Sequence, residues 1–233
     1  MNKGLFYKNI FPVDWIEKFA TCNGRYPLSQ RDIAMRWGDD IFKRNCIVGG
    51  SWRDFLVTNT PDNVSLGTQK EILSGGPSCP IVLDMDMNEQ TIRHCKCSGT
   101  RNACDECWEH IMMPIMKTTQ SFLVDIFGFQ RVLFVFSGKR GFHCYILDEK
   151  VWSWTSEQRA TLLHRIPTPI KFDEAITVDL GHLVKMPLFP HQATKRISCP
   201  IGDLDGFRPS HAPEYSKVTK DQMDQWSQAI LLK

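Results

Sequence analysis

Two aspartates at the end of an apolar run are the residues of this sequence best suited to metal chemistry. Asp84 and Asp86 follow the run Pro80–Leu83, which is apolar enough to predict a central β-strand. On a strand, residues i and i+2 lie on one face about 7 Å apart, so both carboxylates would reach into one site. Carboxylate oxygens bind hard divalent cations, and two such groups repel each other unless a cation neutralises them. A strand with a merely polar face is the alternative.

Four cysteines within 13 residues predict a structural zinc site. Their pattern is Cys95-x-Cys97-x6-Cys104-x2-Cys107. Four thiolates close a tetrahedral zinc site that has no open position, as in a structural knuckle. The first gap is shorter than usual, so His94 could replace one cysteine as a ligand. Redox chemistry and unrelated buried cysteines are the alternatives.

A basic turn flanked by glycines suits phosphate binding. Residues 137–143 read Ser-Gly-Lys-Arg-Gly-Phe-His and contribute the side chains of Ser137, Lys139, Arg140 and His143. A hydroxyl, two cations and an imidazole are all partners of phosphate, and glycine lets the backbone come close to a ligand. The spacing matches neither a Walker loop nor a dinucleotide-binding fingerprint. A plain hairpin with a basic turn is the alternative.

Further candidate ligands lie in the last third of the chain. Asp173 would add a third carboxylate to a metal site, and Lys185 would meet phosphate charge. His182, His191 and the pair Lys195-Arg196 lie in the same segment. Each of these alone is an ordinary surface or structural residue. Together with the paired aspartates and the cysteine cluster, they favour metal-assisted phosphoryl transfer.

The elements that position these residues are predicted from hydrophobic periodicity. Helices are expected over Leu5–Thr21 (with a break at Pro12), Trp108–Gly128, Thr155–Leu163 and Thr219–Leu232, and strands over Pro80–Met87, Arg131–Phe136 and Phe142–Leu147. The segment Thr58–Ser78 is rich in Gly, Ser, Pro, Thr and Asn and reads as a loop region. Strands alternating with helices predict an α/β or α+β domain.

Length and composition favour one soluble globular domain. The chain has 233 residues, 42% hydrophobic and 23% charged, which excludes a disordered chain. Its apolar runs are too short to cross a bilayer, and Asp14 and Glu17 interrupt the only early apolar stretch, so no secretory signal is expected. The net charge of +2 requires any phosphate-binding surface to be local. Nine cysteines without a signal indicate a reducing compartment.

Taken together, these motifs show that the chain resembles the catalytic small subunit of the archaeo-eukaryotic DNA primases. The similarity extends over most of the chain and keeps the family's order. It is carried by Leu5–Phe19, Asp32–Trp37, Val82–Met87, Cys95–Trp108, Phe127–Phe129, Ser137–His143 and Asp173–Ile201. Each motif alone is weak, but the combination is specific.

The resemblance implies a two-metal nucleotidyl-transfer site. Asp84, Asp86 and Asp173 would hold two Mg²⁺ or Mn²⁺ ions. The incoming nucleotide would be bound by Arg36, Ser137, Lys139, Arg140, His143, His182, Lys185 and His191, with His191 towards the sugar. The cysteines would form the family's zinc knuckle at residues 94–107, holding one structural Zn²⁺. The implied fold is the family's α/β catalytic core, a mixed sheet flanked by helices in a single domain, residues 1–233.

The activity that the resemblance implies is synthesis of short RNA primers on single-stranded DNA. The implied partners are the DNA template, NTPs, the RNA primer and a primase large subunit or other replication protein, with no membrane. A site of DNA replication such as the nucleus is expected, and a form this compact would suit a large DNA virus.

The sequence departs from the family's pattern at two places. Lys139 stands where the family usually has arginine, which replaces a bidentate phosphate contact by a point charge. Cellular members carry a helical subdomain, which contributes to docking of the large subunit, where this chain has only a short segment near 164–171. The usual mode of docking is therefore in question.

Two other functions are compatible with these residues. A primase-polymerase that extends primers with dNTPs would keep the fold and the site. A non-catalytic zinc-containing module that binds nucleic acid would need no carboxylate trio, and carboxylates repel a phosphate backbone unless metal intervenes. RNA priming is the leading hypothesis.

Overall fold

Two antiparallel sheets form the frame of the protein. The computed structural model describes residues 1–21, 31–38, 41–43, 50–69, 80–87 and 102–231. One sheet has the order β2-β1-β3-β7 and the other β4-β6-β5. Their strands are β1 (Arg31–Trp37), β2 (Ile41–Lys43), β3 (Asn63–Gln69), β4 (Ile81–Asp86), β5 (Val132–Phe136), β6 (Gly141–Ile146) and β7 (Val184–Lys185).

The α/β class is confirmed, and the arrangement of strands differs in detail from the mixed sheet that was expected. Every pairing between described strands is antiparallel. The four-residue turn 137–140 accounts for one of these pairings, because a tight turn can join only antiparallel strands. The strands predicted at Pro80–Met87, Arg131–Phe136 and Phe142–Leu147 are confirmed as β4, β5 and β6.

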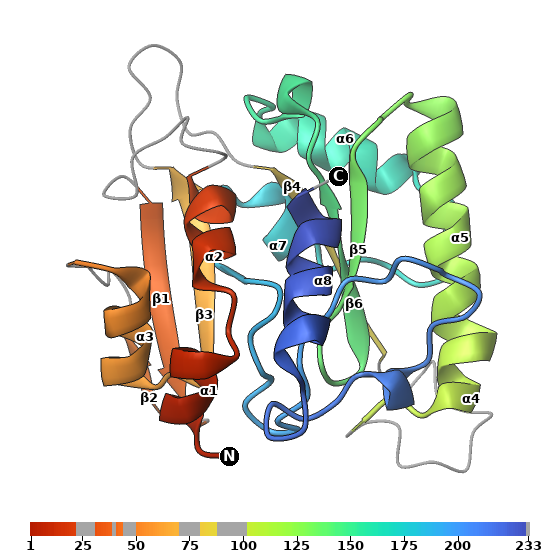
Figure 1. Cartoon of the computed structure of the whole chain (residues 1–233). Helices are drawn as coiled ribbons and strands as arrows, with labels where there is room; N and C mark the ends of the chain where they lie inside the picture. Colours follow the sequence, from red (N-terminus) through yellow and green to blue (C-terminus); the bar gives the residue numbers. More distant parts are fainter. Residues whose placement is uncertain (22–30, 39–40, 44–49, 70–79, 88–101, 232–233) are drawn as a thin grey trace.

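Helices cover the outer faces of both sheets and the seam between them. Figure 1 shows α5 along the outer side of the β4-β6-β5 sheet, α3 beside the other sheet, and α8 in front of the seam. The helices are α1 (Lys3–Asn9), α2 (Val13–Ala20), α3 (Trp52–Asn59), α4 (Asp105–Cys107), α5 (Met113–Ser121), α6 (Ser156–Arg165), α7 (Glu174–Val178) and α8 (Lys220–Leu231). Among the described helices, none is long and apolar enough to span a membrane.

The predicted helices are confirmed, with local departures. Pro12 separates α1 from α2, as expected from its missing N–H. The helix predicted over Trp108–Gly128 is continuous from α4 through α5 but includes the π-helical segments Trp108–Met112 and Phe122–Ile126. A capping box of Thr155 and Gln158 begins α6. Residues 166–173 lead directly from α6 to α7.

Two predictions about strands are wrong. Thr58–Ser78 was expected to be a loop, but β3 lies within it, with Val64 and Leu66 buried. Its polar residues Asn63 and Ser65 alternate with these apolar ones and face a cavity, which explains the loop-like composition.

The second wrong prediction concerns β4. It was expected to be a central strand, but it is the outer strand of the described β4-β6-β5 sheet. Its free edge is covered by the segment that includes α7. The Asp173 N–H donates to the Asp84 carbonyl (2.9 Å), and the Thr177 hydroxyl donates to the Val82 carbonyl (2.9 Å). These bonds satisfy carbonyl groups that another strand would otherwise pair.

Candidate active site

The pairing of β4 with β6 places the two aspartates beside the basic turn. Asp84 lies opposite His143, and Asp86 lies opposite Gly141, the first residue of β6. The His143 Nε2 is 3.5 Å from an Asp84 carboxylate oxygen, and the Arg140 Nε donates to the Asp86 carboxylate at 3.2 Å. The backbone bond between Asp173 and Asp84 brings the third predicted carboxylate alongside β4.

The carboxyl group of Asp84 is affected by the charges of the other two carboxylates, Asp86 and Asp173. Burial, and after it the charges of Asp86 and Asp173, raise the pKa of Asp84 to about 7 against the opposing charges of Lys185 and Arg140. A carboxyl group with this pKa is only partly ionised at neutral pH, because the surrounding protein does not fully stabilise its charged form. The site therefore favours an additional positive charge.

In the structure the three carboxylates contact other groups of the same chain. Asp173 is the N-cap residue of α7, and its carboxylate accepts from the N–H groups of Ala175 (3.0 Å) and Ile176 (3.4 Å). Over the part of the chain that the structure describes, no three His, Cys, Asp or Glu side chains converge closely enough to hold a metal ion.

A cavity of about 380 Å³ lies between the two sheets, next to these carboxylates. Pockets for small ligands in proteins commonly have this volume. Of the residues predicted to act at the site, the cavity is lined by Arg36, Asp84, Asp86, Ser137, Lys139, His143, Lys185 and His191. The two sheets thus bring into one cavity residues from the strand β1, from β4 and β6, and from the last third of the chain.

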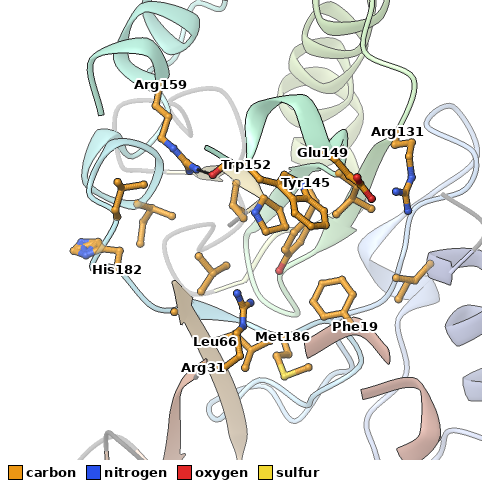
Figure 2. A pocket seen from close by; sticks show the side chains of 18 of the residues that line it. Phe19, Arg31, Leu66, Arg131, Tyr145, Glu149, Trp152, Arg159, His182 and Met186 are labelled. Atoms are coloured by element: carbon orange, nitrogen blue, oxygen red, sulfur yellow. Dashed lines mark hydrogen bonds between the residues drawn. The ribbon is translucent and has the colours of Figure 1, made fainter. Parts of the chain in front are cut away.

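Three predicted residues do not line this cavity. Arg140 pairs with Asp86, and the Asp173 carboxylate caps α7. His182 lines a second cavity, shown in Figure 2, where its Nδ1 is 3.6 Å from an Asp179 carboxylate oxygen.

Three polar lining residues were missed from the sequence: Asn63, Ser65 and Gln192. The alternation of polar and apolar residues along β3 is a signal that could have revealed the first two.

The zinc prediction is not tested by the structure. Cys95 and Cys97, together with His94, lie outside the described residues. Cys104 is the N-cap residue of α4, where its Sγ accepts from the Cys107 N–H at 3.3 Å. Cys104 and Cys107 therefore lie at the first turn of one helix.

Burial controls the charge of the bases in the cavity. Burial lowers the pKa of Lys185 to about 7, although Asp86 and Asp84 oppose the fall. Burial and the charge of Lys185 lower the pKa of both His143 and His191 to about 3. Both imidazoles are therefore neutral at pH 7. The Nδ1 of His191 accepts from the Ala193 N–H (3.1 Å), which leaves the proton on Nε2, available to a ligand oxygen.

The turn 137–140 packs closely against the loop His191–Arg196. Gly138 has φ +90°, and a Cβ there would lie 2.9 Å from the His191 Cβ and 3.0 Å from the Arg196 carbonyl. The Thr194 hydroxyl donates to the Gly138 carbonyl (2.6 Å), and the Lys185 ammonium donates to the Ser137 carbonyl. Glycine at 138 is therefore required by both conformation and space.

The other side of this loop is held by the β1–β3 sheet. Lys195 donates to the buried Asp62 carboxylate (3.2 Å), and the Asn63 side chain donates to that of Gln192 (3.0 Å). Asp62 also accepts from Lys3 of α1 (3.0 Å) and from the Gly38 N–H (2.7 Å). The loop is thus fixed to both sheets at once.

Comparison with solved structures defines the class of fold. The chain is similar to the polymerase domain of Mycobacterium tuberculosis ligase D, solved in complex with DNA. The TM-score is 0.51 at 14% identity, and the match covers 88% of this chain and 82% of that one. The fold is therefore that of a nucleic-acid polymerase domain of this type.

Sequence comparison then gives the family. A family model described as DNA primase small subunit matches residues 83–170. The DNA primase small subunit of Saccharomyces cerevisiae is 32% identical over 81% of this chain and 48% of its own length. The small subunit of Drosophila melanogaster is 35% identical over 62% of this chain and 36% of its own length. That of Caenorhabditis elegans is 26% identical over 70% of this chain and 42% of its own length. The chain belongs to the archaeo-eukaryotic DNA primase small-subunit family, as its motifs predicted. It spans about half or less of the length of these relatives.

We expect Gly141→Ala to destabilise the protein strongly. A Cβ at this position would lie 2.1 Å from the Met85 carbonyl oxygen and 2.2 Å from an Asp86 carboxylate oxygen, so β4 and β6 must separate. Overpacking of this kind costs about 1–3 kcal/mol, which urea unfolding would measure. Gly202→Ala is the control, since a Cβ there meets nothing within 4 Å. Equal stability of the two variants would show that the strand pairing is wrong.

We expect Asp62→Asn to lower the free energy of unfolding at pH 7 by about 1–3 kcal/mol, because two ammonium groups lose a buried counter-ion. Burial alone would raise the pKa of Asp62, but its bonds to Gly38, Lys3 and Lys195 lower it overall. A lowered folded-state pKa stabilises the protein above the ordinary aspartate pKa, and that contribution disappears as the pH falls through the folded value.

The difference between wild type and Asp62→Asn should therefore shrink below about pH 4. Urea unfolding at pH 7 and pH 3 would measure it. Asp224→Asn breaks an exposed ion pair with Lys220 and is the matched control, for which little change is expected. A difference for Asp62→Asn that persists at pH 3 would contradict the ion-pair explanation.

Proposed function

We propose that this chain is the catalytic part of a DNA primase, which synthesises short RNA primers on a single-stranded DNA template by nucleotidyl transfer. One observation carries the proposal: a single cavity has carboxylates on one wall and phosphate-binding cations on the others. Membership of the primase small-subunit family supports the same function. The template, the NTPs, the RNA primer and a primase large subunit or other replication protein are the proposed partners.

The cations of the cavity would bind the triphosphate of the incoming nucleotide. Lys139 extends from the basic turn, Lys185 lies buried behind it, and Arg36 enters from β1. A buried ammonium with a lowered pKa is stabilised as a cation when phosphate charge arrives. Phosphate binding would therefore restore full charge to Lys185, so the lysine responds to the ligand that it holds.

The neutral histidines would act as hydrogen-bond donors to the nucleotide. His191 keeps its proton on Nε2 because its Nδ1 accepts from the backbone. His143 lies beside Asp84 at the base of the cavity, buried and neutral. Neutral donors orient a ligand without adding charge that would repel metal ions. Gln192 and Asn63, which are bonded to each other, would limit the space available at the edge of the cavity.

The donor set of Asp84, Asp86 and Asp173 fits a pair of divalent cations, Mg²⁺ or Mn²⁺. Three carboxylates are hard oxygen ligands, and a bound cation would relieve both the burial and the mutual repulsion that raise the pKa of Asp84. Such ions, when bound, supply activation of the primer 3′-hydroxyl and neutralisation of the leaving pyrophosphate. The chain's own carboxylates would position them, and Lys139 and Lys185 would stabilise the negative charge that develops on the phosphates.

A substitution at Asp84 tests the catalytic proposal. Asp84→Asn keeps the size of the side chain but removes a ligand charge, and we expect it to reduce nucleotide joining at least 100-fold while leaving the circular dichroism spectrum unchanged. The assay would use labelled ribonucleotides, single-stranded DNA and Mg²⁺ or Mn²⁺, on both unprimed and primed templates. Asp179→Asn, an exposed carboxylate outside the catalytic cavity, is the control and should retain activity.

Residual joining within tenfold of wild type in Asp84→Asn would overturn the proposed role of the carboxylates. Parallel reactions with dNTPs separate RNA priming from a primase-polymerase function. If wild type joins nothing on either template but binds DNA, the chain is a nucleic-acid binding module instead.

We further propose that Cys95, Cys97, Cys104 and Cys107 hold one structural Zn²⁺, and that the protein acts at a site of DNA replication such as the nucleus. The placement of Cys104 and Cys107 on one helical turn supports the zinc assignment. We expect about one zinc per chain by elemental mass spectrometry of protein purified without chelator. Cys107→Ser should lower both the zinc content and the thermal midpoint, whereas Cys144→Ser, in the core of β6, should keep the zinc. Full zinc content in Cys107→Ser would refute the assignment.

A further inference from the structure

A second cavity lies between the two sheets, beyond the catalytic one. Its volume is about 110 Å³. Figure 2 shows Arg31, the first residue of β1, directed upward into it, with Tyr145 and Trp152 above, Phe19 of α2 at one side and His182 at the other. An apolar cavity of about 150 Å³ binds benzene in an engineered lysozyme, so the volume of this cavity is of the order of one aromatic ring.

The two cavities lie along the same face of the β4-β6-β5 sheet. Val82 pairs with Tyr145, two residues along the ladder from the pair Asp84 and His143, so all four side chains project to one side. Ile176 and Val184 line both cavities. A ligand in the second cavity would therefore be a direct neighbour of the catalytic site.

A hydrogen-bonded link joins the two cavities. The Tyr145 hydroxyl donates to the Lys185 carbonyl at 3.0 Å, and the Lys185 ammonium donates to the Ser137 carbonyl in the catalytic cavity. Tyr145 is a wall of the second cavity. Any displacement of its ring on ligand binding would act on the backbone of the lysine that is proposed to hold phosphate.

The lining combines aromatic rings with an excess of positive charge. Phe19 and Tyr145 meet edge to face with ring centroids 5.9 Å apart, and Trp152 adds a third ring. Among the described residues of the lining, the charged ones are the cations Lys18, Arg31, Arg131 and Arg159 and the anions Glu149 and Asp179. Aromatic surface with an excess of arginine and lysine suits a planar ring that carries an anionic group.

We propose that this cavity is a second ligand site, which binds a single-ring nucleobase bearing a phosphate, with the ring against the aromatic side chains and the phosphate towards the arginines. The volume of the cavity favours a pyrimidine over a purine. The chemistry of recognition depends on this cavity alone, and only its influence on primer synthesis rests on the proposed function. The ligand is either a free nucleotide or one unit of a nucleic-acid strand.

Binding of UMP in buffer without added Mg²⁺ or Mn²⁺ and without chelator tests the proposal, because the catalytic cavity lacks its metal ions there. We expect UMP to raise the thermal midpoint and to bind by calorimetry at least tenfold more tightly than uridine or ribose 5-phosphate, each of which lacks one half of the recognised chemistry. AMP should bind at least fivefold more weakly than UMP. Absence of UMP binding up to 10 mM would overturn the proposal, whatever the outcome of the priming assay.

Variants locate the bound UMP. Leu66→Phe adds bulk to the wall of the second cavity and should abolish binding, and Arg131→Gln should weaken it at least fivefold, with Arg131→Lys restoring part of the loss. Lys139→Ala alters only the catalytic cavity and should bind UMP as wild type does. If Leu66→Phe does not fold, Arg131→Gln and Arg131→Lys decide. Loss of binding in Lys139→Ala, or wild-type binding in both cavity variants, would overturn the proposal.

Competition distinguishes the two sources of the ligand. Displacement of UMP by a short oligouridylate at a lower concentration than by UMP itself would identify a unit of a strand. The opposite order would identify a free nucleotide.

Discussion

The antiparallel ladder between β4 and β6 is the constraint on which the rest of the site depends. It sets Asp84 opposite His143 and Asp86 opposite Gly141, so the carboxylates and the basic turn lie at the same end of one strand pair. A shift of one residue would turn both aspartates into the apolar core, where Leu83 and Met85 are fully buried. Gly141 holds this register because its Cα approaches the Met85 carbonyl too closely for any side chain.

This register forces opposite charges to share a buried space without neutralising each other fully. Asp84 has a raised pKa and Lys185 a lowered one, and burial is the main cause of both shifts. A closer Asp84–Lys185 ion pair would relieve that cost, but Lys185 is held instead by the Ser137 carbonyl. Lys185 thus stays available to a further anion and Asp84 to a further cation, and the loop His191–Arg196, bonded to Gly138 and to Asp62, connects the two sheets around them.

The sequence predicted best what is contiguous along the chain. The paired aspartates, the turn Ser137–Arg140 and most helices follow from local spacing, and the motifs identified the family. Prediction from the sequence failed where side chains that are distant along the chain meet only in the folded protein. The strand β3 was hidden because its cavity-facing residues, Asn63 and Ser65, are typical of turns. Asp62 gave no local signal, because its partners Lys3 and Lys195 are 59 and 133 residues away. The strand β4 can lie at the edge of its sheet because the Asp173 N–H bonds to the Asp84 carbonyl, and the sequence pattern of a strand does not reveal such a bond.

The same long-range packing explains why two cavities of different character lie along one face. Near the turn, polar residues of β3 line the first cavity together with the carboxylates, whereas further along the strand Leu66 and Gly67 line the second cavity together with Tyr145. Tyr145 lies between the two. Burial raises its pKa far above the ordinary tyrosine value, so the hydroxyl stays protonated and remains a donor to the Lys185 carbonyl. A neutral hydrogen bond therefore links the two cavities, and a displacement of the Tyr145 ring would reach Lys185 without bringing a further charge between them.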